Sequence, residues 1–312
     1  MDRHQVGAPD RKPALVLGGG GAYGLLQAAY VQAAFERGFE PAMVVGTSVG
    51  TLNGAWVAVH PHRADELLPI WLGLDRIRLL QLNPLRVASR LIRRPVSICT
   101  NRIVPQLIER YLPGARFEDT KLPLAVVATN LSRARKHVFR SGPLEPAILA
   151  STAIPGVFEP VEIEGELFVD GGLVGSCDLA TAVEMGATEI LAIDLTPPAK
   201  PRRPRTALGV LRHSLDALGR ASTDAMESCL EGQLPMRVIT PDLSRSSPWR
   251  MDVTVDAINH NLELARRAMA SVLDSHGQVI PGSRTFDAPA PAPVPGAPAP
   301  RRLSLPWARQ EA

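Results

Sequence analysis

Hydrophobic positions along this chain change repeatedly from short continuous runs to helical spacing, which predicts strands and helices in turn. The runs that predict buried strands are residues 14–17, 42–45, 124–128, 190–193 and 237–239. Helical spacing occurs at residues 23–37, 49–59, 180–185, 207–230 and 253–273. A further stretch, 161–169, predicts a hairpin that turns at Gly165. Such alternation is typical of parallel strands with helices on both faces, so the pattern predicts an α/β fold.

The two ends of the chain differ from this central part. Residues 1–12 are polar and predict a flexible arm, and residues 285–312 are rich in alternating alanine and proline. That alternation lacks backbone donors and apolar bulk, so it predicts a disordered tail. The residues between these ends, 13–275, predict a single domain. No apolar run has the length of a membrane span, and the N-terminus does not look like a secretory signal. We therefore expect a cytoplasmic protein.

Composition narrows the class of partner. The 312 residues are 45% hydrophobic and 21% charged, which is typical of a globular protein. Aromatic residues make up 4% and the net charge is +3, so a nucleic-acid partner is not expected. The three cysteines, Cys99, Cys177 and Cys229, are widely spaced. They predict neither a disulfide framework nor a metal site.

One segment has a different charge from the rest. Residues 76–108 contain seven arginines and no acidic residue, interleaved with leucine and isoleucine. An apolar face beside a basic face is what an anionic membrane surface attracts, which predicts a basic amphipathic cap with transient membrane contact. An ordinary amphipathic helix pair with a solvated basic face is the alternative.

A glycine-rich loop, Leu17 to Gly24, follows the first predicted strand and opens the first predicted helix. Backbone N–H groups in such a loop suit an anion, either a phosphate or a developing oxyanion. The spacing Gly19-x-Gly21-x-x-Gly24 matches the dinucleotide fingerprint. That class of site also needs an acidic residue at the end of the second strand, where this chain has none, so we reject nucleotide binding.

The end of the second strand carries a candidate nucleophile instead. Gly46-Thr47-Ser48-Val49-Gly50 is a GxSxG sequence at a predicted strand-to-helix turn, the context of a nucleophile elbow. Gly46 and Gly50 would let the neighbouring backbone approach, and Ser48 would project from the sheet.

A serine hydroxyl needs a base, and the most telling candidate is Asp170. It ends a predicted strand and is followed by Gly171 and Gly172, which leave space around its carboxylate. None of the seven histidines lies in an evident motif.

Together these motifs resemble the patatin-like phospholipase family of lipid acyl hydrolases. The resemblance covers GGGGAYG, GTSVG, the segment Ala150–Val161, and the Asp-Gly-Gly motif continuing to Leu195. It implies a three-layer α/β/α fold and a Ser48–Asp170 dyad without histidine. It also implies an oxyanion hole of Gly19, Gly20 and Gly21, a lipid ester substrate and no cofactor. A dyad base should have a raised pKa, so we expect Asp170 to be buried.

The chain departs from the family at Tyr23, where many members have arginine or lysine. A tyrosine carries no charge for a lipid phosphate, although the acyl chemistry does not need one. Two alternatives stay open: an α/β-hydrolase triad completed by His260 or His276, and a catalytically silent lipid-binding or regulatory protein of the same fold.

Overall fold

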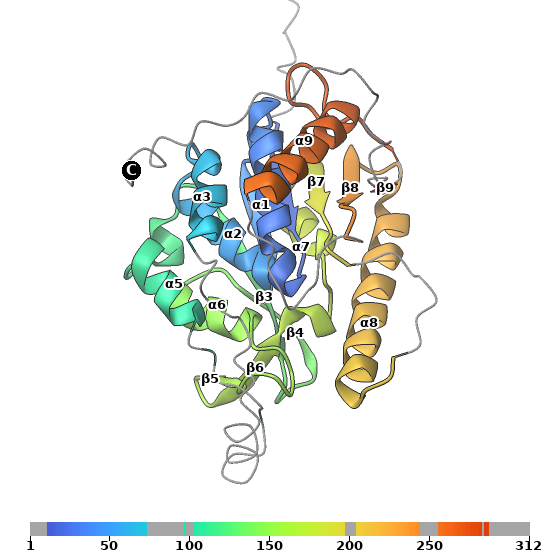
Figure 1. The fold of residues 1–312 in the computed structure, drawn as a ribbon. Helices are drawn as coiled ribbons and strands as arrows, with labels where there is room; N and C mark the ends of the chain where they lie inside the picture. The colour runs from blue at the N-terminus through green and yellow to red at the C-terminus, as the bar shows by residue number, and fades with distance from the viewer. Residues whose placement is uncertain are drawn as a thin grey trace, which may run out of the picture.

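A computed structural model describes residues 11–73, 97, 101, 103–196, 204–243, 255–282 and 284–286. These residues build a nine-stranded mixed sheet in the order β5-β6-β3-β2-β1-β7-β8-β9, and β4 also pairs with β3 (Figure 1). The strands are β1 Pro13–Leu17, β2 Met43–Thr47, β3 Leu124–Asn130, β4 Arg135–Phe139, β5 Val161–Ile163, β6 Glu166–Asp170, β7 Glu189–Ile193, β8 Met236–Thr240 and β9 Thr285–Phe286.

The sheet is mostly parallel, as predicted. Strands β3, β2, β1, β7, β8 and β9 are parallel neighbours, whereas β4, β5 and β6 are antiparallel additions around β3. The five predicted strands and the hairpin are confirmed. Strand β4 was not predicted, because its sequence Arg-Lys-His-Val-Phe has neither a continuous apolar run nor full burial.

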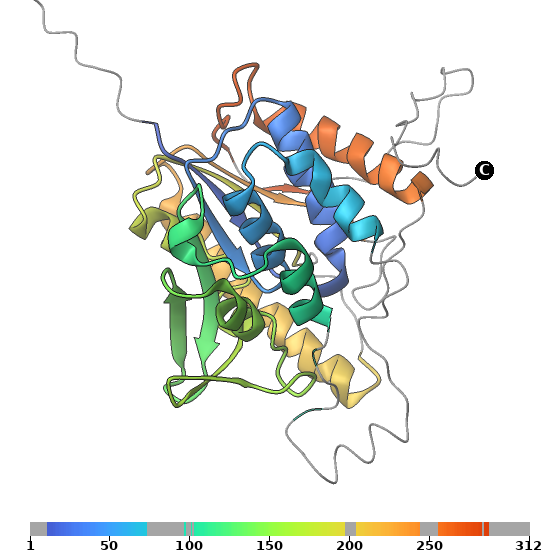
Figure 2. The ribbon, with the colours of Figure 1, turned by 90° about the vertical axis from the view of Figure 1, so that its left-hand side faces the viewer.

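Helices cover both faces of the sheet, which confirms the three-layer architecture. They are α1 Gly24–Glu36, α2 Val49–Val59, α3 Leu67–Leu72, α5 Ile103–Tyr111, α6 Leu144–Ser151, α7 Leu179–Glu184, α8 Ala207–Leu230 and α9 Val255–Val272. Along β1, Leu15 and Leu17 face one core with α1, α2, α3, α5, α6 and α9. Ala14 and Val16 face a second core with α7 and α8. Figure 2 shows α1, α3 and α9 gathered on the first face.

The predicted segment boundaries need two corrections. Arg11, in the predicted arm, pairs with Glu189 at 2.5 Å and donates to the carbonyl of Gly277, so the end of the arm is anchored. The predicted tail begins two residues too early, because Thr285 and Phe286 pair with β8 before the Ala-Pro run starts.

The predicted basic cap lies almost wholly outside the described residues, which resume continuously at Ile103 with α5. The apolar positions of α5 that the cap shares, Val104 and Ile108, are buried against the core. Among the helices that the structure describes, none combines the length and the apolar character needed to cross a bilayer.

Candidate active site

Strand pairing along one edge of β3 brings the two predicted catalytic residues together. β2 pairs with the first part of this edge and ends with Thr47 opposite Val127. β6 runs antiparallel to β3, pairs with the second part of the same edge and ends with Asp170 opposite Ala128. β4 occupies the other edge of β3. Val127 and Ala128 are consecutive, so the end of β2 lies beside the end of β6. Ser48, the residue after β2, therefore lies next to Asp170.

Ser48 has the strained backbone that a nucleophile elbow requires. Its φ is 54° and its ψ is −126°, a region that residues with a Cβ rarely adopt. Its N–H donates to the hydroxyl of Ser151 at 2.9 Å, and that hydroxyl donates to the carbonyl of Val127 at 2.6 Å. A buried serine on α6 thus ties the turn to β3 and helps to keep the strained conformation.

The two glycines of the GxSxG motif lie where no Cβ fits. A Cβ on Gly50 would lie 2.1 Å from the carbonyl oxygen of Leu17, and one on Gly46 would lie 2.7 Å from Cα of Thr51. The neighbouring atoms belong to the backbone, so they cannot move aside. The glycines let α2 pack directly against β1 and β2, which points the start of α2 at the glycine loop.

Replacing Gly50 with alanine should therefore destabilise the fold. We expect a loss of about 3 kcal/mol or more in the free energy of unfolding, because the new methyl group must displace the end of β1. Thermal and urea unfolding would measure it. Gly175→Ala is the matched control, since its Cβ would be 3.7 Å from the nearest atom. Equal stabilities of the two variants would contradict this reason for the motif.

The side chains of Ser48 and Asp170 are in direct contact. Ser48 Oγ donates to Asp170 Oδ2 at 2.5 Å, and the N–H of Gly172 donates to Asp170 Oδ1 at 2.8 Å. Burial raises the pKa of Asp170 to about 6, against smaller opposite effects of the hydrogen bonds from Ser48 and Gly172. The expectation of a raised pKa is thus confirmed. Gly171 packs against β3, where a Cβ would lie 2.4 Å from the carbonyl of Val127.

The glycine loop lies beside Ser48, but its three predicted oxyanion donors are not equivalent. The N–H of Gly19 donates to the carbonyl of Ser176 at 2.9 Å, so this amide is already paired. A Cβ on Gly19 would lie 3.1 Å from Cβ of Ser48, which measures how close the loop comes. Within the described residues, Gly20 and Gly21 donate no such backbone bond. The paired amide of Gly19 is therefore not free for an oxyanion, and Gly20 and Gly21 remain the candidate donors.

Sequence reasoning missed several residues that support the site. Ser151 lies within the segment that resembles the family, but a serine in a helix gives no sign of a backbone partner in a distant turn. Ser176 supplies the carbonyl for Gly19 and accepts a hydrogen bond from Thr196 at 3.0 Å between hydroxyls. Tyr23, the residue that departs from the family, is buried in the core.

No histidine of the described residues hydrogen-bonds to the side chain of Ser48 or Asp170. The ring of His60 packs on Trp56, and that of His137 packs on Phe139 and Phe168. Since the carboxylate contacts the serine directly, the geometry does not support the triad that His260 or His276 would complete.

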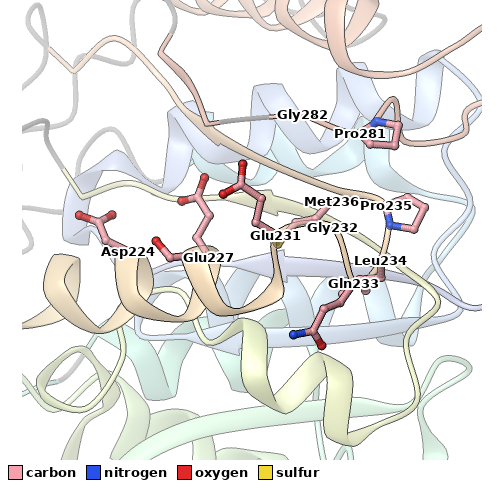
Figure 3. A pocket seen from close by; sticks show the side chains of 11 residues that line it. Asp224, Glu227, Glu231, Gly232, Gln233, Leu234, Pro235, Met236, Pro281 and Gly282 are labelled. Atoms are coloured by element: carbon pink, nitrogen blue, oxygen red, sulfur yellow. The ribbon is translucent and has the colours of Figure 1, made fainter.

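A cavity of about 490 Å³ lies elsewhere, where α8 ends and β8 begins. Figure 3 shows Asp224, Glu227 and Glu231 projecting into it from one side of α8. Two of these carboxylates pair with the largely buried Arg284, Glu227 at 2.9 Å and Asp224 at 3.2 Å. Asp224 and Glu227 thus belong to a structural ion-pair cluster, and the cavity is at the opposite end of the strands from Ser48.

Comparison with known proteins agrees with the motifs. An uncharacterized NTE family protein of Mycobacterium tuberculosis is 32% identical over 189 residues, which cover 61% of this chain and 50% of that protein. Lysophospholipase NTE1 of Mycosarcoma maydis is 32% identical over 181 residues, which cover 58% of this chain and 9% of that protein. The chain thus spans half or less of the length of these relatives.

The crystal structure of VipD from Legionella pneumophila aligns with 85% of this chain and 67% of its own, at 15% identity and a TM-score of 0.47. The family model for patatin-like phospholipases matches residues 15–183, a range that includes the glycine loop, Ser48 and Asp170. Since that range is more than half of the sequence, the chain belongs to the patatin-like phospholipase family.

Proposed function

We propose that this protein is a serine hydrolase of fatty-acyl esters in lipids, acting through a Ser48–Asp170 dyad. The observation that carries the proposal is the 2.5 Å hydrogen bond from Ser48 Oγ to a buried carboxylate, on a strained turn beside a glycine loop. The name lysophospholipase among the relatives supports a lysophospholipid as the first substrate to test.

The reaction would begin with attack of Ser48 Oγ on the ester carbonyl carbon, while its proton moves to Asp170. A carboxylate with a pKa near 6 is a stronger base than an ordinary one, and it is still ionised at neutral pH. The negative charge on the carbonyl oxygen would be stabilised by the N–H groups of Gly20 and Gly21. A donor of this kind typically contributes about 3 kcal/mol to the transition state.

Collapse of this intermediate breaks the bond to the alcohol, which leaves with the proton from Asp170. An acyl-serine remains at Ser48. Water then attacks it and gives its proton to Asp170, and the second collapse returns a proton to Ser48 and releases the fatty acid. Transient contact with an anionic membrane surface through the arginine-rich segment stays part of the proposal.

The test is fatty-acid release from a panel of esters. The panel contains a lysophospholipid, a diacyl phospholipid, a glyceride, and nitrophenyl esters of short and long acids. We expect release from at least one lipid ester. Binding of lipid vesicles with no release from any ester, by correctly folded protein, would favour the silent lipid-binding alternative.

The raised pKa of Asp170 predicts a pH profile. Because the protonated carboxyl cannot accept a proton, kcat/KM for a soluble ester should rise with pH, reach half its maximum near pH 6, and then level off. An imidazole titrates in the same range, so His260→Gln and His276→Gln variants should keep this limb. A midpoint near the ordinary aspartate value of 3.8, or loss of the limb in either variant, would contradict the assignment.

A further inference from the structure

Three buried polar side chains form a hydrogen-bonded chain behind the glycine loop. They are Gln27 on α1, Asn53 on α2 and Trp71 on α3, with exposed fractions of 0%, 1% and 4%. The indole N–H of Trp71 donates to Asn53 Oδ1 at 2.8 Å, and Asn53 Nδ2 donates to Gln27 Oε1 at 3.0 Å. Buried amides in otherwise apolar helices are costly unless they are paired, so this arrangement needs a reason.

This series of hydrogen-bonded side chains ends at two backbone carbonyls, one at each end of the glycine loop. Gln27 Nε2 donates to the carbonyl of Gly18 at 3.0 Å and more weakly to that of Ile193 at 3.3 Å. Asn53 Nδ2 donates to the carbonyl of Gly24 at 3.0 Å. The first and last carbonyls of the segment Gly18–Gly24 are thus held by side chains that also bind each other.

The bond from Gln27 fixes the peptide unit directly before the one that carries the N–H of Gly20, and a turn within the loop fixes the unit that carries the N–H of Gly21. The unit between Gly18 and Gly19 is held at both polar atoms, its oxygen by Gln27 and its N–H by Ser176. The carbonyl of Gly20 accepts from the N–H of Tyr23 at 3.2 Å. In a trans peptide the N–H points away from the carbonyl, so the N–H of Gly21 points away from that turn.

Trp71 determines how the amide groups of Asn53 and Gln27 are oriented. An indole nitrogen can only donate, so Asn53 must present its oxygen to Trp71 and its NH2 group to Gly24 and Gln27. Gln27 must then present its own NH2 group to the loop. A flip of either amide would bring two donors or two acceptors together, so one N–H on α3 selects a single arrangement.

The ring of Trp71 also contacts the site. A Cβ on Gly24 would lie 2.4 Å from Cζ2 of Trp71 and 2.4 Å from Cγ2 of Val49. The indole and the side chain of Val49, the residue that follows the nucleophile, therefore both pack against the last glycine of the loop.

We propose that Gln27, Asn53 and Trp71 are positioning residues, which hold the glycine loop so that the N–H groups of Gly20 and Gly21 face the developing oxyanion. This inference rests on the proposed function. Removing one of them should misplace the oxyanion donors and so lower the rate of the chemical step. Because none of the three touches the substrate, its binding should be unchanged.

The main test is Trp71→Phe, which removes the N–H and keeps an aromatic ring. We expect kcat on a hydrolysed ester to fall about 10-fold, with KM changed less than 2-fold and the pH midpoint unchanged. Gln27→Met, which leaves the carbonyl of Gly18 without its partner, should lower kcat about 100-fold, within the range for loss of one oxyanion donor. The double variant should cost no more than Gln27→Met alone, because the residues act as a unit.

Each variant has a matched control. Trp56→Phe removes the N–H of another buried tryptophan, which is 7% exposed and donates to the carbonyl of Arg63 at 3.0 Å. Gln32→Met removes another amide of α1, which donates to Glu36 at 2.9 Å. Both controls should keep kcat within 2-fold.

A second readout separates positioning from loss of folded protein. A long-chain trifluoromethyl ketone adds Ser48 Oγ to its carbonyl carbon, which places a negative oxygen where the oxyanion forms. Its affinity should fall by the same factor as kcat/KM, while inhibition by the product fatty acid stays constant. The inference would be overturned if Trp71→Phe had the same kcat as Trp56→Phe. Equal losses of affinity for the ketone and for the fatty acid would also overturn it. Absence of Ser48-dependent hydrolysis in the unchanged protein would instead refute the proposed function.

Discussion

Replacement of Ser48 by alanine should lower fatty-acid release by about 10⁴- to 10⁶-fold, close to the detection limit. The nucleophile cannot be replaced by a neighbour, because among the described residues only Ser48 donates a hydroxyl to the carboxylate of Asp170. Removing a catalytic serine in other hydrolases costs this order of magnitude and leaves the small rate that binding and the oxyanion hole provide. Release of free fatty acid, measured on the best ester of the panel, gives the rate.

The control for Ser48→Ala is Ser214→Ala, since Ser214 is exposed on α8 and bonds only within its helix at 3.0 Å. This variant should have the activity of the unchanged protein. A Ser48→Ala variant that keeps more than a few per cent of the rate would show that the nucleophile lies elsewhere.

Replacement of Asp170 by asparagine should lower kcat by about 10²- to 10⁴-fold, the usual contribution of a general base. The amide keeps the size of the side chain, and its oxygen can still accept from the N–H of Gly172. The fold should therefore survive while the proton acceptor is lost. The residual activity should also lose the limb near pH 6, because the group that titrates there is gone.

Asp178→Asn is the matched control for Asp170→Asn. Asp178 is as buried as Asp170, at 7% against 8% exposed, but it caps α7 and pairs with Lys136 at 2.9 Å. We expect some loss of stability and at most a few-fold change in kcat. Similar kcat losses in the two variants, after correction for folded protein, would contradict a specific role of Asp170 as the base.

The central elements of the fold could be predicted because local patterns determine them. Continuous apolar runs predicted β1 and β7, and GxSxG predicted the turn at Ser48 because this motif has a backbone requirement of its own. The distance between Ser48 and Asp170 could not be predicted. It depends on the pairing of β2 and β6 with consecutive residues of β3, which is a tertiary property.

Other parts of the site were missed for the same reason. Gly19 looks equivalent to Gly20 in sequence, and only the carbonyl of Ser176, more than 150 residues away in the chain, makes its amide different. Gln27 and Asn53 left a usable signal, a polar amide within an apolar helix. That signal indicates a buried hydrogen bond, but it does not reveal the partner.

Fluorophosphonate labelling as a function of pH would test the activation of Ser48 by Asp170, because the probe reports the nucleophile and its base without a choice of lipid. We expect peptide mass spectrometry to find the label on Ser48, and the labelling rate to rise with a midpoint near pH 6. Labelling should also be at least 100-fold slower in Asp170→Asn. Label on another residue, or an unchanged rate in Asp170→Asn, would contradict direct activation of Ser48 by Asp170.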